Sequence, residues 1–295
     1  MARVTVGMAV FNGAETIAES LDSVVGQSFQ DFEVLVVDDG STDDSGAMAR
    51  SRGCRVISQT NQGLGAARRR LVEEAAGDFV AFVDADDTWT LDKLERQIAV
   101  IEHTGSALVH SDCWYLHKDG HAVERNLDLP ANVDALDHIV PNNLVVASSA
   151  LFDRRRMLEA GNFSSDTVRC SDWYGWFLLA SQNSFVHLPE KQVRYKVLPT
   201  SLANAGFSFH DAQRYVLEEK VLPRFDELFA RLDEHRRASY RRKLLRALGV
   251  SYSAMGKALL KQGKVHEARE MGRKAIRLAP GVARVWTRAL KGYLP

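Results

Sequence analysis

The sequence has little cysteine and no long apolar run. Its 295 residues include three cysteines, Cys54, Cys113 and Cys170, which lie too far apart for a disulfide framework or a zinc cluster. Scarce cysteine is typical of the reducing cytoplasm, which is the expected location. No run of 18 apolar residues occurs, so we expect no membrane-spanning helix. The first residues also lack the pattern of a signal peptide.

The chain as a whole also lacks an excess of charge. It has 38 Lys and Arg, 38 Asp and Glu, and 45% hydrophobic residues, a composition that excludes a disordered or fibrous protein. The balance hides a division, because residues 1–230 carry a net charge of −13 and residues 231–295 a net charge of +13. Such a basic segment is typical of contact with lipid head groups, of contact with nucleic acid, or of a solvated helical face, and charge alone does not choose among the three.

Short apolar segments alternate with segments of helical spacing through the first 110 residues. The pattern predicts strands at 4–10, 33–37, 54–57, 79–83 and 107–110, with helices at 15–25, 43–50, 63–76 and 91–103, the second of these capped by Thr42 or Asp43. Nearly all-apolar strands are typical of parallel sheets covered on both faces. The sequence therefore predicts an α/β, Rossmann-like, mostly parallel sheet with helices on both faces.

Acidic residues follow two of the predicted strands. Asp38 and Asp39 come after one strand, and Asp84, Asp86 and Asp87 come after another. Ligands of open α/β sheets bind beyond the carboxyl ends of the strands, so the two groups are expected in one crevice. A divalent cation such as Mg²⁺ typically takes one or two carboxylates together with phosphate oxygens. The pattern indicates a metal–diphosphate ligand, and the alternative is that these residues only initiate turns.

Five segments in order resemble family 2 glycosyltransferases of the GT-A fold. They are VTVGMAVFN at 4–12, SLDSVVGQSF at 20–29, VVDDGSTD at 36–43, NQGLGAAR at 61–68 and GDFVAFVDADD at 77–87. The resemblance covers roughly residues 1–200. It implies a glycosyltransferase of glycan or polysaccharide assembly, which takes its sugar from a nucleotide-diphosphate donor, UDP- or dTDP-linked, and passes it to a hydroxyl of a glycan or lipid-linked acceptor.

The resemblance assigns roles in donor binding to individual residues. Phe11 stands in the place of a usual Tyr and is expected to lie against the nucleotide base, and Ala9 is expected to contribute mainly backbone. Asp39 resembles the carboxylate that accepts a hydrogen bond from the ring N–H of uracil or thymine. Asp38 is expected to hold loop backbone or a basic side chain. Arg68 resembles the Arg of an Ala-Arg-Asn segment, although Arg replaces the Asn that usually follows.

The Asp-X-Asp segment carries the expected metal site. Asp84 resembles its first carboxylate, near the ribose and the sugar, and Asp86 resembles the last, which binds Mg²⁺ or Mn²⁺ between the two phosphates. A nucleotidyltransferase of similar fold is disfavoured, because a glycine-rich, basic phosphate loop is missing after the first predicted strand.

The resemblance places the catalytic base at Asp172, with Ser171 in the position of the family's usual Glu. Asp172 is expected near a helix N-terminus, where the helix dipole favours the ionised carboxylate. The alternative is an N-cap Asp backed by an aromatic core, and the two roles are compatible. Trp114, Trp173 and Trp176 are expected to line an acceptor groove, with core packing as the alternative for Trp176.

One departure from the family pattern concerns the segment after the base. Leu198 stands where many relatives have a His near the diphosphate, so either Lys196 supplies the positive charge or the loop contributes little. This departure leaves a second interpretation open, a catalytically weak scaffold that binds nucleotide sugars and recruits partners or membrane through its tail.

The C-terminal region is expected to be helical. Residues 207–230 predict a helix broken near Pro223, and residues 237–260 and 264–278 predict a hairpin that resembles one tetratricopeptide-type unit. The expected organisation is a catalytic domain at 1–205, a connecting helix at 206–230 and a basic hairpin at 231–295. One such unit buries its face only against a neighbour, either the catalytic domain or a partner. Peripheral contact with the inner membrane face is expected through 231–295, and no nucleic acid is expected.

Overall fold

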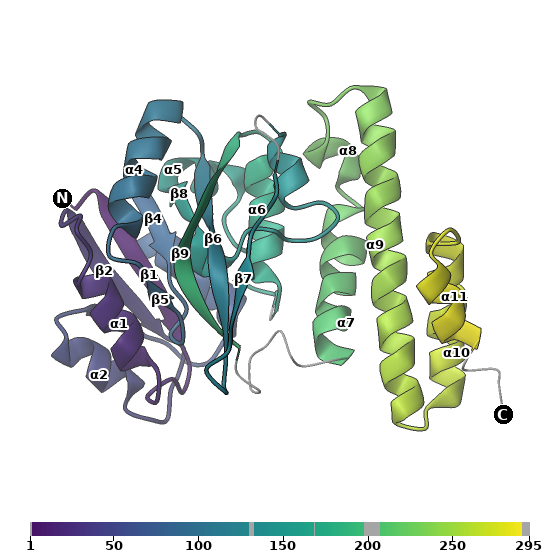
Figure 1. Cartoon of the computed structure of the whole chain (residues 1–295), viewed down its shortest axis with the longest axis horizontal. Coiled ribbons are helices and arrows are strands. Elements are labelled where there is room, and N and C mark those ends of the chain that lie inside the picture. Colours follow the sequence, from purple (N-terminus) through teal and green to yellow (C-terminus); the bar gives the residue numbers. More distant parts are fainter. Residues whose placement is uncertain (1, 130–132, 168, 198–206, 291–295) are drawn as a thin grey trace. The chain divides into compact units, whose positions relative to one another are not determined.

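The computed structural model describes residues 2–129, 133–167, 169–197 and 207–290. Contacts divide the chain into an N-terminal unit of residues 1–138 with 144–198 and a helical unit of residues 139–143 with 199–295. The expected connecting helix and the expected hairpin both lie in the helical unit. Figure 1 labels the elements of both units.

The strands are β1 (Val4–Val10), β2 (Phe32–Asp38), β3 (Arg55–Ser58), β4 (Phe79–Phe82), β5 (Thr88–Trp89), β6 (Leu108–His117), β7 (Ala122–Arg125), β8 (Leu151–Asp153) and β9 (Phe185–Val197). The α-helices are α1 (Ile17–Val25), α2 (Ser45–Ser51), α3 (Leu64–Glu74), α4 (Lys93–Thr104), α5 (Arg154–Ala160), α6 (Ser171–Ala180), α7 (Phe207–Tyr215), α8 (Phe225–Leu228), α9 (Glu234–Lys261), α10 (Val265–Leu278) and α11 (Ala283–Leu290).

The N-terminal unit is built on one nine-stranded mixed sheet among the described residues. Its order is β3-β2-β1-β4-β8-β6-β9-β5, with β7 paired to β6. The first four strands run parallel, β8 runs antiparallel to both β4 and β6, and β6 pairs with β9 in parallel. Helices lie on both faces of this sheet (Figure 1), so the predicted architecture is confirmed.

The buried apolar runs of β1, β2 and β4 form the centre of the core, as their sequences predict. The long strand β9 was not predicted. Its sequence contains Pro189 and several charged residues and does not form a buried apolar run. Pairing with β6 organises it as a strand, with a shift of register between Ser111 and Cys113.

Helix α2 begins without the side-chain cap that was expected, and α3 begins at a glycine. α2 begins after Asp44, not after Thr42 or Asp43, although the Asp43 carboxylate accepts a hydrogen bond from the Ser45 amide at 3.1 Å. α3 begins after Gly63, whose φ of 89° lies in the region that favours glycine. A Cβ at Gly65 would lie 2.4 Å from the Ser164 carbonyl oxygen, so α3 approaches this loop closely because residue 65 is a glycine.

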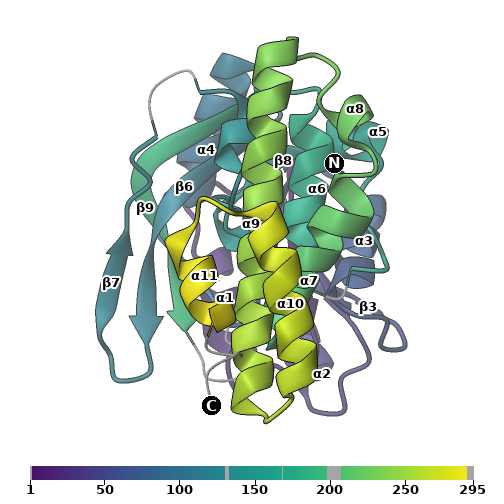
Figure 2. The same ribbon diagram turned by 90° about the vertical axis from the view of Figure 1, so that its right-hand side faces the viewer.

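The helical unit contains the predicted break and the predicted hairpin. A π-helical stretch at Val216–Val221 follows α7, and the chain turns at Pro223 before α8. α9 and α10 lie side by side as a hairpin (Figure 2), and they turn at Gly263, which has a φ of 75°. α11 was not predicted, and it packs against both α9 and α10.

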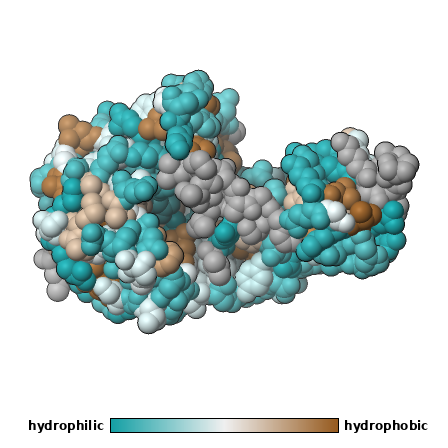
Figure 3. Space-filling model, turned by 90° about the horizontal axis from the view of Figure 1, so that it is seen from below, coloured by the Kyte–Doolittle hydropathy of each residue, from teal (hydrophilic) through white to brown (hydrophobic). Residues whose placement is uncertain are grey.

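No helix among the described residues is long and apolar enough to cross a membrane. The face drawn in Figure 3 is mostly hydrophilic, with small separate hydrophobic patches.

Candidate functional site

The two acidic groups lie at the same edge of the sheet, on either side of β1. Asp38 at the end of β2 pairs in register with Val10, and the Asp39 amide donates to the Val10 carbonyl at 2.8 Å. On the other side of β1, the Val83 amide after β4 donates to the Gly7 carbonyl at 3.1 Å. Parallel pairing therefore brings the loop after β2 and the Asp84–Asp87 turn to the carboxyl ends of neighbouring strands, as predicted.

Hydrogen bonds join the loops that follow β1 and β2. Asn12, which has a φ of 52°, accepts a bond from the Thr42 amide through its side-chain oxygen at 2.8 Å. The Gly13 amide donates to the Ser45 hydroxyl at 2.8 Å, and the Ala14 amide donates to the Asp43 carboxylate at 2.9 Å.

These bonds hold Phe11 at the edge of the sheet, where the residue is 53% exposed. The exposed aromatic side chain of Phe11, at the carboxyl ends of the strands, is available to stack against a flat ring of a ligand. Ala9 lies within β1, half-buried and paired with Val37, so it offers mainly backbone.

Asp39 is buried and organises the loop before α3. One carboxylate oxygen accepts bonds from the Gln59 side chain at 2.7 Å and the Gln62 amide at 2.9 Å. The other oxygen accepts a bond from the Gly63 amide at 2.8 Å. A carboxylate has about four acceptor positions, so three bonds leave room for one more donor.

Asp38 has the loop-holding role that was expected. Its carboxylate accepts a bond from the Ser41 amide at 2.9 Å, and it lies so close to Gly46 that a Cβ there would meet it at 2.6 Å.

Arg68, Asp84 and Asp172 meet although they come from three different elements. From α3, Arg68 Nη2 lies 2.9 Å from Asp84 Oδ1, and its Nη1 lies 3.7 Å from Asp172 Oδ1 in α6. The same Nη1 donates to the Ser171 hydroxyl at 3.2 Å. Burial lowers the pKa of Arg68, but the charges of Asp84 and Asp172 outweigh it, so its pKa is raised and the guanidinium stays charged.

Asp172 lies in the first turn of α6, but it is not the N-cap, which was one of its two predicted roles. The N-cap is Cys170, with a φ of 55° and no capping side-chain bond. Burial raises the pKa of Asp172, the Arg68 charge opposes this, and the Asp84 charge adds to it. The net shift is upward, opposite to the effect expected from the helix dipole. Asp172 is therefore a stronger base than an exposed aspartate.

Within the Asp-X-Asp turn, Asp86 is the carboxylate with the fewest protein partners and so the most available as a ligand. Asp84 is bound by Arg68, and the buried Asp87 accepts bonds from the Ser148 hydroxyl at 2.5 Å and the Lys196 amide at 3.1 Å. The half-buried Asp86 accepts no hydrogen bond from another residue of the described segments. Burial and the neighbouring Asp84 charge raise its pKa to about 6.

The acidic turn fits a hard cation that phosphate oxygens also bind. The described residues contain no group of three or more His, Cys, Asp or Glu side chains arranged to hold a metal by themselves. One carboxylate plus phosphate oxygens is a typical Mg²⁺ environment, and a cation would offset the repulsion that raises the pKa of Asp86.

Three further residues interact with the acidic turn through hydrogen bonds or charge and were not assigned to it from the sequence. The Ser148 hydroxyl accepts a bond from the Asp84 amide at 3.0 Å in addition to its bond with Asp87. Burial, and then the charges of the acidic turn, raise the pKa of Tyr195 well above its ordinary value. The Lys196 ammonium pairs with Glu19. The sequence analysis did not single out Ser148 or Tyr195, and it considered Lys196 only as a positive charge near the diphosphate; Leu198 lies outside the described residues.

Two of the three tryptophans expected in an acceptor groove lie in the core instead. Trp173 is 2% and Trp176 is 0% exposed, because α6 is apolar on almost every face and is covered all round. Trp114 is half-buried on β6. The alternative of core packing is therefore correct for Trp176 and holds for Trp173 as well.

Residues 5–151 match the family described as Glycosyl transferase family 2. The chain belongs to this family. An uncharacterized glycosyltransferase of Rickettsia felis is 31% identical over 186 residues, which are 62% of this chain and 31% of that protein. The chain thus spans about a third of the length of this relative. WfgD of Escherichia coli, named as a UDP-Glc:alpha-D-GlcNAc-diphosphoundecaprenol beta-1,3-glucosyltransferase, is 25% identical over 185 residues, 61% of this chain and 71% of WfgD.

The fold is shared with solved structures of this class. The crystal structure of residues 1–349 of TarS from S. aureus superimposes with a TM-score of 0.70 at 18% identity, covering 99% of this chain and 89% of that one. The same TarS fragment in complex with UDP-GlcNAc gives a TM-score of 0.63 at 16% identity, with the same coverage. These likenesses confirm the GT-A fold that the sequence predicts.

Proposed function

We propose that this chain transfers a sugar from a nucleotide-diphosphate donor, UDP- or dTDP-linked, to a hydroxyl of a glycan or lipid-linked acceptor. The observation that carries the proposal is the junction of Arg68, Asp84 and Asp172, which puts a carboxylate of raised pKa beside the acidic turn. A TarS structure solved with UDP-GlcNAc supports the class of donor. The activity in the name of WfgD supports a UDP-sugar donor and a diphosphate-linked acceptor.

The nucleotide would bind over the loops after β1 and β2. The exposed ring of Phe11 would pack against the base, and the backbone of Ala9 would face the nucleotide. The remaining acceptor position of Asp39 would take the ring N–H of uracil or thymine, since its other positions are filled by the chain itself. Arg68 would hold Asp84 in place near the ribose and the sugar.

Asp172 would act as the general base. It would take the proton of the acceptor hydroxyl as that oxygen forms a bond to the anomeric carbon, while the bond from this carbon to the diphosphate oxygen breaks on the opposite face. Attack from the opposite face inverts the anomeric configuration. A raised pKa suits the role, because a general base works best when its pKa approaches the working pH.

Asp86 would hold Mg²⁺ or Mn²⁺, and the bound ion would neutralise charge on the leaving diphosphate. Two observations support this assignment. Asp86 is the one carboxylate of the turn that accepts no hydrogen bond from another described residue, and its pKa is raised to about 6 by burial and by Asp84.

Removing the proton acceptor tests the proposal. A thermal-shift screen of UDP- and dTDP-sugars with Mn²⁺ identifies the donor, because the ligand that binds best raises the melting temperature most. With that donor, Asp172→Asn is expected to slow release of the nucleotide diphosphate by about 10²–10⁴-fold while the donor still binds. Asp78→Asn is the matched control, since Asp78 is exposed at the amino end of β4 and should leave the rate unchanged.

A weakly catalytic scaffold that binds nucleotide sugars is the second candidate. The observation that favours it is the ion pair of Lys196 with Glu19, which occupies the ammonium that could otherwise replace the missing His near the diphosphate. If wild type and Asp172→Asn both bind the donor and turn it over equally and very slowly, the scaffold is favoured over the transferase.

Residues 231–295 are proposed to make peripheral contact with anionic lipid at the inner membrane face. Their net charge of +13 supports this contact, because each basic residue near an anionic surface contributes about 1 kcal/mol.

A further inference from the structure

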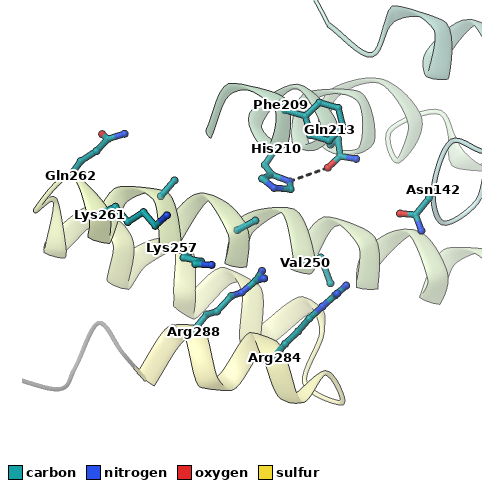
Figure 4. A pocket seen from close by; sticks show the side chains of 12 residues that line it. Asn142, Phe209, His210, Gln213, Val250, Lys257, Lys261, Gln262, Arg284 and Arg288 are labelled. Atoms are coloured by element: carbon teal, nitrogen blue, oxygen red, sulfur yellow. Dashed lines mark hydrogen bonds between the residues drawn. The ribbon is translucent and has the colours of Figure 1, made fainter. Parts of the chain in front are cut away.

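The helical unit contains a hollow of about 660 Å³ that none of the roles above uses. It is lined by side chains of α7, α9 and α11 together with Asn142 (Figure 4). Its volume falls within the range of about 300–1,000 Å³ that is typical of sites for small molecules.

Four cationic side chains line the hollow, and no acidic side chain does. Lys257 and Lys261 lie one turn apart on α9, and Arg284 and Arg288 lie one turn apart on α11. Figure 4 shows Arg284 and Arg288 extending from α11 toward α9. Among the residues that the structure describes, none of the four forms an ion pair. Arg214 in α7, by contrast, is paired with Asp211 and Glu218.

Repulsion among these cations favours an anion in the hollow. Like charges at positions i and i+4 of a helix destabilise it by a few tenths of a kcal/mol, and the hollow contains two such pairs. Phosphate oxygens accept charge-assisted hydrogen bonds from Lys and Arg, which are stronger than bonds between neutral groups. A ligand with one or two phosphate groups would compensate both pairs together.

The rest of the lining is suited to an uncharged organic group. Val250, Ala254 and Ala258 follow one another at four-residue spacing, so they share one face of α9, and the two alanines leave space there. Phe209 adds an aromatic surface. Polar side chains complete the lining, including His210, which is hydrogen-bonded to Gln213 at 3.1 Å.

We propose that this hollow is a second ligand site, which binds an organic phosphate or pyrophosphate ester. The phosphate groups lie among Lys257, Lys261, Arg284 and Arg288, and the organic part lies on the apolar face of α9. The inference stands on the helical unit alone and does not depend on the proposed transfer reaction.

Calorimetric titration of the full chain with glucose 1-phosphate and with inorganic pyrophosphate tests the proposal. The titrations are done at physiological ionic strength in EDTA, so that metal-dependent binding elsewhere does not contribute. The variant Lys257→Gln/Arg284→Gln removes one cation from each helix and is expected to raise both dissociation constants about tenfold or more. The charge-preserving variant Lys257→Arg/Arg284→Lys should stay within a few-fold of wild type.

The matched control is Arg242→Gln/Arg246→Gln. These two exposed arginines lie one turn apart on α9, outside the hollow, and the double variant removes the same charge. Its dissociation constants should equal those of wild type, and thermal melting checks that each variant is folded.

Three results would overturn the proposal. The first is no binding of either probe to wild type. The second is equal weakening in the hollow variant and in the control, which would indicate a diffuse charge effect. The third is loss of flotation with phosphatidylglycerol vesicles in the hollow variant with no change for the soluble probes, which would assign these cations to a membrane surface.

Discussion

Arg68 is a single buried cation that serves two carboxylates. It bonds to Asp84 and lies 3.7 Å from Asp172, and its own side chain is only 5% exposed. Removing one partner of a buried ion pair leaves the other charge buried and unpaired. This lowers the stability of the fold by more than the pair itself adds to it.

Arg68→Met keeps most of the side-chain volume and removes the charge. We expect it to lower the free energy of unfolding by about 1–3 kcal/mol at neutral pH, measured by denaturant unfolding. Arg69→Met is the control, because the Arg69–Glu73 pair is exposed and should contribute about 0.5 kcal/mol or less. Equal effects of the two substitutions would contradict the role assigned to Arg68.

The raised pKa of Asp86 predicts a pH-dependent stability. Its pKa rises from 3.8 to about 6 on folding, so the folded state disfavours the ionised carboxylate. This penalty is absent below the unfolded pKa and complete above about 6. In EDTA, Asp86→Asn should therefore unfold at higher denaturant concentration than wild type at pH 7.5, and at nearly the same concentration below pH 4.

Adding Mn²⁺ with the nucleotide diphosphate should reverse that order at pH 7.5, since a bound cation favours the ionised Asp86 and the variant lacks this ligand. A wild type that is the more stable protein in EDTA at pH 7.5 would show that Asp86 carries no such penalty.

Helix α3 places Arg68, and a glycine determines how closely that helix packs. A Cβ at residue 65 would lie 2.4 Å from the Ser164 carbonyl oxygen and 2.5 Å from that of Thr167, and backbone atoms cannot rotate away. The loop before α6 and the start of α3 are therefore fitted to each other by the absence of a side chain.

Gly65→Ala is expected to lower the free energy of unfolding by about 1–3 kcal/mol, even though alanine favours helix. It should also weaken donor binding, because α3 carries Arg68. Gly281→Ala is the comparison, since a Cβ at Gly281 would meet nothing within 4 Å, and its effect should be near zero. Thermal melting of the two variants side by side makes the measurement.

The chain as a whole has opposite charge in its two parts. Residues 1–230 carry a net charge of −13 and residues 231–295 carry a net charge of +13. The protein is therefore neutral overall, with its positive charge concentrated in the C-terminal segment. If only the net charge of the whole chain mattered, the protein would be attracted weakly to an anionic surface. If residues 231–295 make the contact, the protein should bind, and added salt should weaken the binding.

Flotation with vesicles that contain phosphatidylglycerol distinguishes the two expectations. We expect the protein to float at low salt, to be released at high salt, and not to bind vesicles of pure phosphatidylcholine. Binding to phosphatidylcholine that equals binding to the anionic vesicles would contradict an electrostatic contact through 231–295.

Local sequence was sufficient for the elements of the parallel half of the sheet and for the positions of its acidic turns. β1, β2 and β4 are apolar runs, which are stable only when buried. Because these strands are parallel, the residues that follow them, including Asp39 and Asp86, lie at one edge of the sheet. Likewise, Gly263 separates the two predicted helices of the hairpin, and in the structure it adopts the left-handed conformation that ends α9.

Contacts between distant segments decided the rest. β9 is a strand because β6 pairs with it, and Asp87 is a buried loop anchor because Ser148 and the Lys196 amide reach it from two other elements. The rise in the pKa of Asp172 depends on how much solvent the fold removes around it, which outweighs the opposing charge of Arg68. Periodicity and turn chemistry act within a few residues, whereas burial and ion pairing depend on which segments meet, and that is known only once the chain is folded.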